Sequence, residues 1–411
     1  MRERLLVAAL LLLHLALIVV PSVREVALRP AGGDLASSWC AVRTALDGQD
    51  PYDLAALQAP VQAAGHSSKG VEAFLYPPPA LLWFLWSAVV SLPLARWLWF
   101  GANLGLLAGA VFLLRRWIGA RLSTVLMAAA LFTPLIDNAR MGQVNLLVLL
   151  LVLLALQGAD ERRGLGGVAV AAGFLTKLSP AILVPWLLVR RRWRALLGFA
   201  AGAVVLSLLA APLTGPGASW RFWSEVLPGF SRGHYGQNAY DIVAFRGHSL
   251  LRLAVLLIQG QGEVTEPGLA ARIAANMVAL GLLGGALWVA RPVRSAREPG
   301  IAAALCVVMI VSAPFTWEHH LVLALLPVAV ALHGARTGLL GRRWRAMAVI
   351  AALMLMIPAS WWEKPAWLFP ELFTPCTSAK TLALLALWAV GLRYATALEP
   401  RGAEDRPPAP L

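Results

Sequence analysis

The sequence Gly32-Gly33-Asp34-Leu35-Ala36-Ser37-Ser38-Trp39 directly follows the first membrane-length apolar run and opens a polar loop. From there, apolar residues recur at helical spacing: Leu35, Trp39, Val42 and Leu46. The pattern predicts a helix with Asp34 at its N-cap, beside the membrane. A carboxylate in that place lies near backbone N–H groups and at the edge of a low-dielectric region, which tunes its affinity for protons. Asp34 is therefore either a simple helix cap or a proton-handling group.

The composition indicates a protein built in a membrane. Of the 411 residues, 59% are hydrophobic and 14% are charged, which excludes an ordinary soluble protein. Lys and Arg outnumber Asp and Glu by 35 to 21, but the arginines stand in short knots between apolar runs: Arg115-Arg116, Arg162-Arg163, 190–194, Arg291 to Arg297 and Arg342-Arg343. This spacing reflects membrane topology, so we expect no nucleic-acid partner. The cysteine pattern gives no indication of a metal or redox site.

The order and length of the apolar runs predict an all-α polytopic membrane protein of about twelve spans. Arg2 and Arg4 place the N-terminus in the cytoplasm, so a first span at about 5–22 delivers Asp34 to the outer side. Residues 1–398 are expected to form a single transmembrane domain and 399–411 a disordered cytoplasmic tail. The expected outer loops cover about 23–95, 137–144, 214–268 and 361–377. Whether 74–94 crosses the membrane or lies in its interface stays open.

Unusual polar residues fall on the outer side of this topology. They include Asp34, Tyr76, Asp137, Arg140, Gln143, Asn145, Lys177, His248, Trp317, Glu318, His319 and His320. Simpler interpretations exist, because Lys177 can extend to the interface and the amides can bond neighbouring helices. However, ionisable groups at membrane depth are costly and usually mark a site. Their convergence predicts one outward-facing cavity that holds an acid, a base and a cation.

The residue types in this cavity favour one kind of chemistry. Glycoside hydrolysis usually needs two carboxylates across the scissile bond. Transfer of a sugar from a lipid phosphate needs one base for the acceptor hydroxyl, since the phosphate leaves as a stable anion that Lys or Arg can hold. A lipid donor also explains a site that opens to the bilayer.

Five motifs stand in the order found in a known family: Asp34 in the outer loop, Tyr76-Pro77-Pro78, Gly142-Gln143-Val144-Asn145, Lys177-Leu178-Ser179-Pro180 and Ser312 to His320. In this the chain resembles the family 87 glycosyltransferases, GT-C-fold enzymes that include polyprenyl-phosphate-mannose-dependent alpha-mannosyltransferases of phosphatidylinositol mannoside synthesis. The resemblance implies a GT-C-like helix bundle with outer-face loop helices, an inverting transfer at an extracytoplasmic site, and Asp34 as catalytic base. One place differs, because Gly247-His248-Ser249 stands where the family often has Asn-Gln-Ser ahead of an arginine.

The sequence thus predicts an integral membrane glycosyltransferase that moves a sugar, mannose in first place, from a polyprenyl-phosphate donor to a lipid-linked or cell-envelope glycan without a cofactor or metal. Asp34 is the expected general base, and Lys177, with Arg140 as second candidate, is expected to hold the donor phosphate. The other expected substrate-binding residues are Tyr76, Gln143, Asn145, His248, Trp317, His319 and His320. Two alternatives stay open: an arabinofuranosyltransferase with a polyprenyl-phosphate arabinose donor, and a membrane transporter or lipid flippase.

Overall fold

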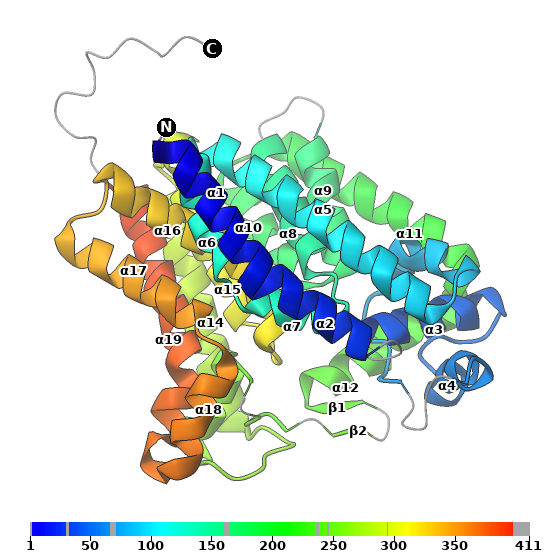
Figure 1. Cartoon of the computed structure of the whole chain (residues 1–411). Coiled ribbons are helices and arrows are strands. Elements are labelled where there is room, and N and C mark those ends of the chain that lie inside the picture. The colour runs from blue at the N-terminus through cyan, green and yellow to red at the C-terminus, as the bar shows by residue number, and fades with distance from the viewer. Residues whose placement is uncertain are drawn as a thin grey trace.

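The computed structural model describes residues 2–29, 33–65, 71–159, 164–235, 238–239, 241–244, 246–293 and 295–397. The Arg162-Arg163 knot and the tail expected at 399–411 lie outside the described residues. The described chain is helical apart from loops and one short antiparallel pairing of β1 (His234–Tyr235) with β2 (Asn238–Ala239). The predicted all-α class is confirmed (Figure 1).

Among the described residues, six helical runs are long and apolar enough to cross a membrane. They are α1–η1–α2 (Arg2–Leu28), α5 (Leu92–Ile118), α11–η4–α12 (Trp193–Ser231), α14 (Leu269–Ala290), η6–α16 (Glu318–Thr337) and α19 (Phe373–Ala395). Large apolar side chains on these runs face outward, such as Leu208 on α11 and Trp288 on α14. Such exposed apolar faces are those of helices that contact lipid. The chain is a polytopic membrane protein, as predicted.

Two bent helix pairs raise the number of candidate spans to as many as eight. Helices α6 (Leu122–Ala130) and α7 (Pro134–Met141) meet at 65°, and α17 (Arg342–Met356) bends by 89° into α18 (Ala359–Leu368). The remaining apolar helices have only 10–17 residues. Because a span needs about 20 residues, the count of about twelve stays a prediction.

The shorter apolar helices form the interior of the bundle. They are η2 (Pro78–Val89), α8 (Asn145–Gly158), α9 (Leu165–Thr176), η3 (Ser179–Ile182) with α10 (Leu183–Val189), and α15 (Glu298–Val311). Every residue of α15 is buried, with α14, α16 (Leu325–Thr337) and α19 packed around it. A helix that is apolar on all sides is expected at such a central place.

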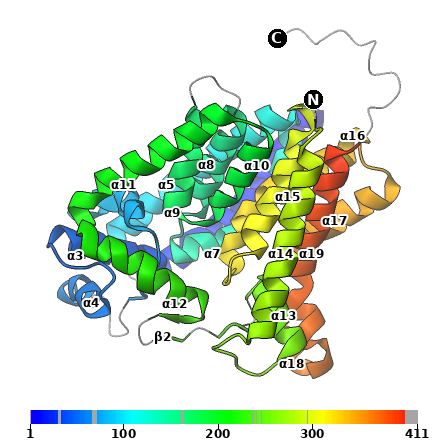
Figure 2. The same ribbon diagram turned by 180° about the vertical axis from the view of Figure 1, so that it is seen from behind.

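The remaining short elements gather at one end of the molecule, opposite the N-terminus (Figures 1 and 2). There lie α3 (Asp34–Leu46), α4 (Leu54–Ala63), α12 (Leu227–Ser231), β1, α13 (Leu250–Ile258) and α18. A turn around Gly48 to Asp53 joins α3 to α4, and Asp53 caps α4 by accepting hydrogen bonds from the N–H groups of Ala55 and Ala56. These elements enclose the candidate site described next.

Two helix boundaries differ from the sequence prediction. Helix α5 begins at Leu92, inside the outer loop expected to reach about residue 95, and it has a proline in its first turn, where proline is well tolerated. The run expected to end near 213 continues to Ser231, but Gly215, with φ of 66°, kinks it there. The predicted break is thus a kink that turns α12 over the site.

Candidate active site

A cavity of about 690 Å³ opens where α3, α7, α12 and the end of α15 approach one another. All of the predicted site residues except His248 line it: Asp34, Tyr76, Arg140, Gln143, Asn145, Lys177, Trp317, His319 and His320. Segments far apart in the sequence therefore supply one polar wall. The convergence predicted from the topology is present in the described chain.

Two glycines bring the start of α3 against the end of α7. Gly33 and Gly142 have φ of 82° and 67°, a region that glycine adopts at little cost. A Cβ on Gly33 would meet the Met141 carbonyl oxygen at 2.5 Å, and one on Gly142 would meet the Leu35 Cβ at 2.7 Å. Only glycine allows this approach, and it places Asp34 beside the residue after Gly142, which is Gln143.

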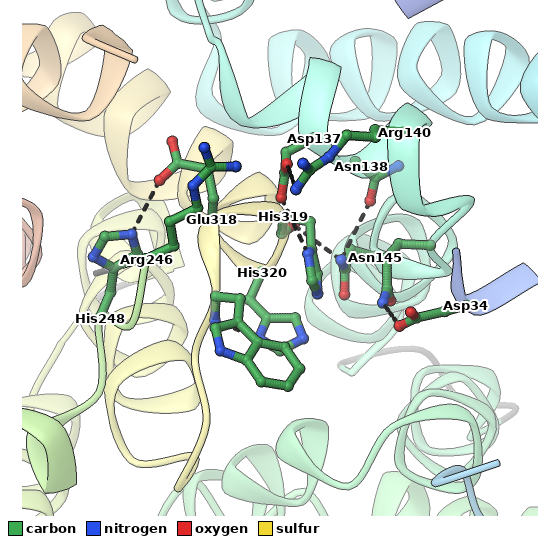
Figure 3. A network of polar contacts seen from close by, with 12 residues as sticks. Asp34, Asp137, Asn138, Arg140, Asn145, Arg246, His248, Glu318, His319 and His320 are labelled. Atoms are coloured by element: carbon green, nitrogen blue, oxygen red, sulfur yellow. Dashed lines mark hydrogen bonds and ion pairs between the residues drawn. The ribbon is translucent and has the colours of Figure 1, made fainter. Parts of the chain in front are cut away.

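Asp34 is the first helical residue of α3, whereas the N-cap is Gly33. The predicted N-cap position of Asp34 is therefore wrong by one residue, because the contact of Gly33 with Met141 fixes where the helix starts. The Asp34 carboxylate accepts a hydrogen bond from Gln143 Nε2 (Figure 3). Tyr76 Oη donates to Gln143 Oε1 at 2.9 Å, which leaves the amide N–H₂ group to face Asp34.

The surroundings of Asp34 make it a stronger base than an exposed aspartate. Burial raises the pKa of Asp34 above its ordinary value, while His319 and Lys177 act in the opposite direction. Within the described part of the chain Asp34 forms no ion pair, and its bonded partner is a neutral amide. Burial and the charge of Asp34 together raise the pKa of Glu72, which lies at the same cavity.

Lys177, like Asp34, is bonded to a neutral side-chain amide. Its Nζ donates to Asn145 Oδ1 at 2.7 Å. Asn145 is oriented by its own Nδ2, which donates to the backbone oxygen of His319 at 2.9 Å and to Asn138 Oδ1 at 3.2 Å. No Asp or Glu among the described residues pairs with Lys177 at ion-pair distance. One short motif, Gly142 to Asn145, thus supplies a neutral amide to the acid and another to the cation.

Three other acids in and around the cavity are ion-paired, whereas Glu72, an exposed residue, forms no ion pair with the described residues. Figure 3 shows most of them, and the pairs are Asp137 with Arg140 and with His319 Nδ1 (3.2 Å), Glu318 with Lys380 and with His248 Nε2 (3.0 Å), and Glu363 with Arg246 Nε (3.0 Å). A carboxylate held by cations is a weaker base, since an opposite charge favours the ionised form. Among the acids that line the cavity wall beside Lys177, Asp34 is the one best placed to take a proton.

The cavity lining also has an apolar and aromatic part. Phe230 of α12 packs on Phe315 with ring centroids 5.0 Å apart, and Trp317 stacks on His320 at 6.1 Å. Leu227 and Ile310 also line the cavity. A cavity lined by both polar and apolar groups suits a substrate that has a polar and an apolar part.

Sequence reasoning misplaced one residue and missed three. His248 does not line the cavity and instead lies behind it, 3% exposed, bonded to Glu318. Lys380, 1% exposed on α19, was not predicted, although a single lysine within an apolar run is a signal for a buried partner. Glu72 and Glu363 line the cavity from polar segments, where acids are too common to stand out.

Residues 74–316 match the family model of glycosyltransferase family 87, which is more than half of the chain. The chain belongs to glycosyltransferase family 87. The matched range of this family 87 chain holds Tyr76, Arg140, Gln143, Asn145, Lys177 and His248, whereas Asp34 precedes it and Trp317 to His320 follow it.

Three curated relatives are each about 30% identical to this family 87 chain over the aligned residues. A polyprenol-phosphate-mannose-dependent alpha-(1-2)-phosphatidylinositol mannoside mannosyltransferase of Mycobacterium tuberculosis is 30% identical over 54% of this chain and 48% of the relative, so the match spans about half of that protein. Its namesake in Mycolicibacterium smegmatis is 29% identical over 74% of this chain and 71% of the relative. An alpha-(1->3)-arabinofuranosyltransferase of Mycobacterium tuberculosis is 31% identical over 38% and 37%. No solved structure matches the chain, so the GT-C-like arrangement stays a prediction.

Proposed function

We propose that this family 87 protein transfers mannose from a polyprenyl-phosphate donor to a lipid-linked or cell-envelope glycan, with inversion, on the extracytoplasmic side of the membrane. One observation carries the proposal. Asp34 and Lys177 lie in one cavity, and each is bonded to a neutral amide of the same motif rather than to an opposite charge. Asp34 can therefore accept a proton, and Lys177 can bind an anion, without first breaking an ion pair.

In the proposed reaction Asp34 is the general base. Its Oδ2 is engaged by Gln143, which leaves Oδ1 to accept the proton of the acceptor hydroxyl. As that proton moves to Asp34, the acceptor oxygen forms a bond to the anomeric carbon and the bond from that carbon to the phosphate oxygen breaks. A single displacement of this kind inverts the anomeric centre.

Lys177 is proposed to bind the phosphate that leaves. The departing polyprenyl phosphate gains negative charge in a cavity of low dielectric, where a fixed cation is worth more than in water. Arg140 is the second candidate, but its pairing with Asp137 reduces the charge it can offer. Phe230 and Ile310 also line the cavity, and this apolar part of the lining suits the isoprenoid end of the donor.

The proposed side of the membrane rests on charge. The described arginine knots, such as Arg115-Arg116 and Arg342-Arg343, follow the positive-inside rule if they are cytoplasmic, and the cavity then faces outward. Cysteines at Gln62 and Arg345, both exposed, test this in cells, with a membrane-impermeant thiol reagent and Cys40, Cys306 and Cys376 replaced. Labelling only at Gln62 is expected, and labelling only at Arg345 would reverse the topology.

Mannose is proposed over arabinose because the mannosyltransferase relatives align over more of this chain than the arabinofuranosyltransferase does. Purified protein in lipid is given labelled polyprenyl phosphomannose or polyprenyl phosphoarabinose with a membrane lipid extract. Transfer of mannose to a chloroform-soluble product is expected. Transfer of arabinose alone would replace the sugar, and no transfer with solute counterflow in proteoliposomes would favour a transporter.

A further inference from the structure

A buried ionic cluster borders the cavity through its acid, Glu318, and neither the proposed base nor the proposed phosphate-binding cation belongs to it. We name it the Glu318 cluster; it consists of Glu318, Lys380 and His248. Their exposed fractions are 5%, 1% and 3%. Glu318 Oε1 bonds to Lys380 Nζ, and Glu318 Oε2 lies 3.0 Å from His248 Nε2 (Figure 3). Both oxygens of one carboxylate are therefore occupied by residues from two other segments.

The cluster joins three parts of the chain that would otherwise be independent. Glu318 begins η6 (Glu318–Ala324), Lys380 lies in α19, and His248 lies in the loop before α13. This loop also docks onto the segment before η6, because the His248 N–H donates to the Thr316 oxygen at 2.6 Å and Ser249 Oγ donates to the Pro314 oxygen at 2.9 Å. The segment that holds η6 in place is thus Gly247-His248-Ser249. It is also the segment where the chain differs from the family pattern.

A stabilising role alone is a poor explanation for such a cluster. Removing an acid and a cation from water costs free energy that their attraction often fails to return, so buried ion pairs are commonly neutral or worse for stability. What a buried pair provides is a fixed geometry. Here the fixed residue is Glu318, which directly precedes His319 and His320, and both histidines line the cavity.

We infer that the Glu318 cluster positions His319 and His320 for the proposed transfer through the bonds that occupy both oxygens of Glu318, and that Lys380 and His248, which do not line the cavity, are positioning residues. The inference rests on the proposed function. With the cluster intact, His319 Nδ1 lies 3.2 Å from Asp137 Oδ2 and His320 Nδ1 accepts from the Trp317 N–H at 3.1 Å. A shift of η6 by 1 Å would move both rings together with Trp317, and displacements of that size cost roughly 10²-fold in rate.

A second buried cluster gives a matched control. Glu298 at the start of α15 is 5% exposed and bonds to Arg192 Nη2 at 2.6 Å and to Arg190 Nη2 at 3.0 Å. Like the Glu318 cluster, it consists of one acid with two basic partners, but none of its members lines the cavity. Replacing an acid by its amide and a buried cation by Met can therefore be done in parallel at both places.

The test measures kcat, the donor KM and the melting temperature of Glu318→Gln/Lys380→Met and of Glu298→Gln/Arg192→Met. Each double variant removes the acid together with its most buried cation. In the Glu298 variant Arg190 stays charged, but its side chain is 19% exposed and keeps its hydrogen bonds to the Ala290 and Arg291 oxygens. We expect both to fold, with kcat lowered roughly 10²-fold for the Glu318 variant and by less than about twofold for the Glu298 variant. Normal kcat in a stable Glu318 double variant would overturn the inference.

His248 supplies a second comparison. His248→Gln keeps an N–H donor for Glu318 and is expected to retain most of kcat, whereas His248→Leu is expected to lower kcat with little change in the donor KM. Equal rises in KM for both would make His248 a substrate contact and contradict the inference.

A readout that needs no turnover separates this inference from the proposed function. An electron cryo-microscopy map of Glu318→Gln/Lys380→Met is expected to show His319 displaced from Asp137, whether or not mannose is the sugar. An unchanged contact between His319 and Asp137 would overturn the positioning role. If wild-type protein transfers no sugar while the map shows the displacement, the proposed function fails and the structural inference stands.

Discussion

The two ends of α15 place buried charges in contrasting surroundings. At its start, Glu298 is held by Arg190 and Arg192, so acid and cation neutralise each other. Past its other end, roughly 20 Å away along the helix axis, Asp34 and Lys177 line a cavity and bond to the amides of Gln143 and Asn145. A charge that is already neutralised has little to offer a ligand, whereas a charge held by an amide keeps its electrostatic reach. The kind of partner, rather than burial alone, separates a structural charge from one that is available for chemistry.

The largest effect is expected at Asp34. Asp34→Asn keeps the size of the side chain and removes the basic oxygen, so kcat should fall by roughly 10²-fold or more, while donor binding and melting temperature stay close to those of the wild type. Steady-state transfer of labelled mannose measures kcat. Glu298→Gln is the control, because it makes the same change from acid to amide outside the cavity. If Asp34→Asn keeps a large fraction of wild-type turnover, Asp34 is structural and Glu72 becomes the next acid to examine.

The second-largest effect is expected for Lys177→Met. Removing the proposed phosphate-binding cation is expected to lower kcat/KM for the polyprenyl-phosphate donor by about 10–10²-fold, because charge on the leaving group is no longer offset. Arg140→Met should cost less, since Arg140 is already paired with Asp137. Unchanged donor binding and rate in Lys177→Met would leave Lys177 as an interfacial lysine that reaches toward water.

The pH dependence of kcat/KM should show the raised pKa of Asp34. A base works when deprotonated, so on the acid side activity should fall about tenfold per pH unit below this pKa. Because burial raises the pKa, the acid limb should lie above pH 3.8, the ordinary value. Gln143→Leu removes a hydrogen bond that favours the ionised carboxylate, so it should move the limb further upward.

Circular dichroism at each pH separates loss of activity from unfolding. A limb at or below the ordinary aspartate value, in protein that remains folded, would contradict the assignment of Asp34 as the base. A limb that Gln143→Leu leaves in place would show that the amide does not tune the carboxylate.

Much of the site could be predicted because its chemistry is local in sequence. The motif Gly142 to Asn145 and the segment Trp317 to His320 each place several polar residues at the end of an apolar run, where a membrane helix reaches water. The family 87 membership and the helical, polytopic class were likewise predictable, since they depend on composition and on ordered motifs. The role of each polar residue inside the cavity remains a proposal.

What the sequence could not provide are contacts between distant segments. The start of α3 is fixed by the approach of Gly33 to Met141, so Asp34 falls one residue inside the helix rather than at its cap. His248 was expected at the cavity because it is polar and in an outer loop, but its place behind Glu318 depends on Lys380 of α19. The short helices were expected as spans because an apolar run of 10–17 residues has the same pattern whether it crosses lipid or lies within protein.

The neutral partner of Lys177 can be changed with little change of shape. Asn145→Asp gives the ammonium group a carboxylate partner and turns it into a paired cation like those at Glu298. Asn145→Leu is the control, because it also removes the two hydrogen bonds that Asn145 Nδ2 donates, and it adds no charge beside Lys177.

The most direct measurement is the affinity of these two variants and the wild type for polyprenyl phosphate in detergent micelles, which requires no turnover. Asn145→Asp should bind polyprenyl phosphate about tenfold more weakly than Asn145→Leu, a difference of about 1.4 kcal/mol. Equal affinities for the two variants would mean that pairing does not decide whether a buried charge is available, and would contradict the account.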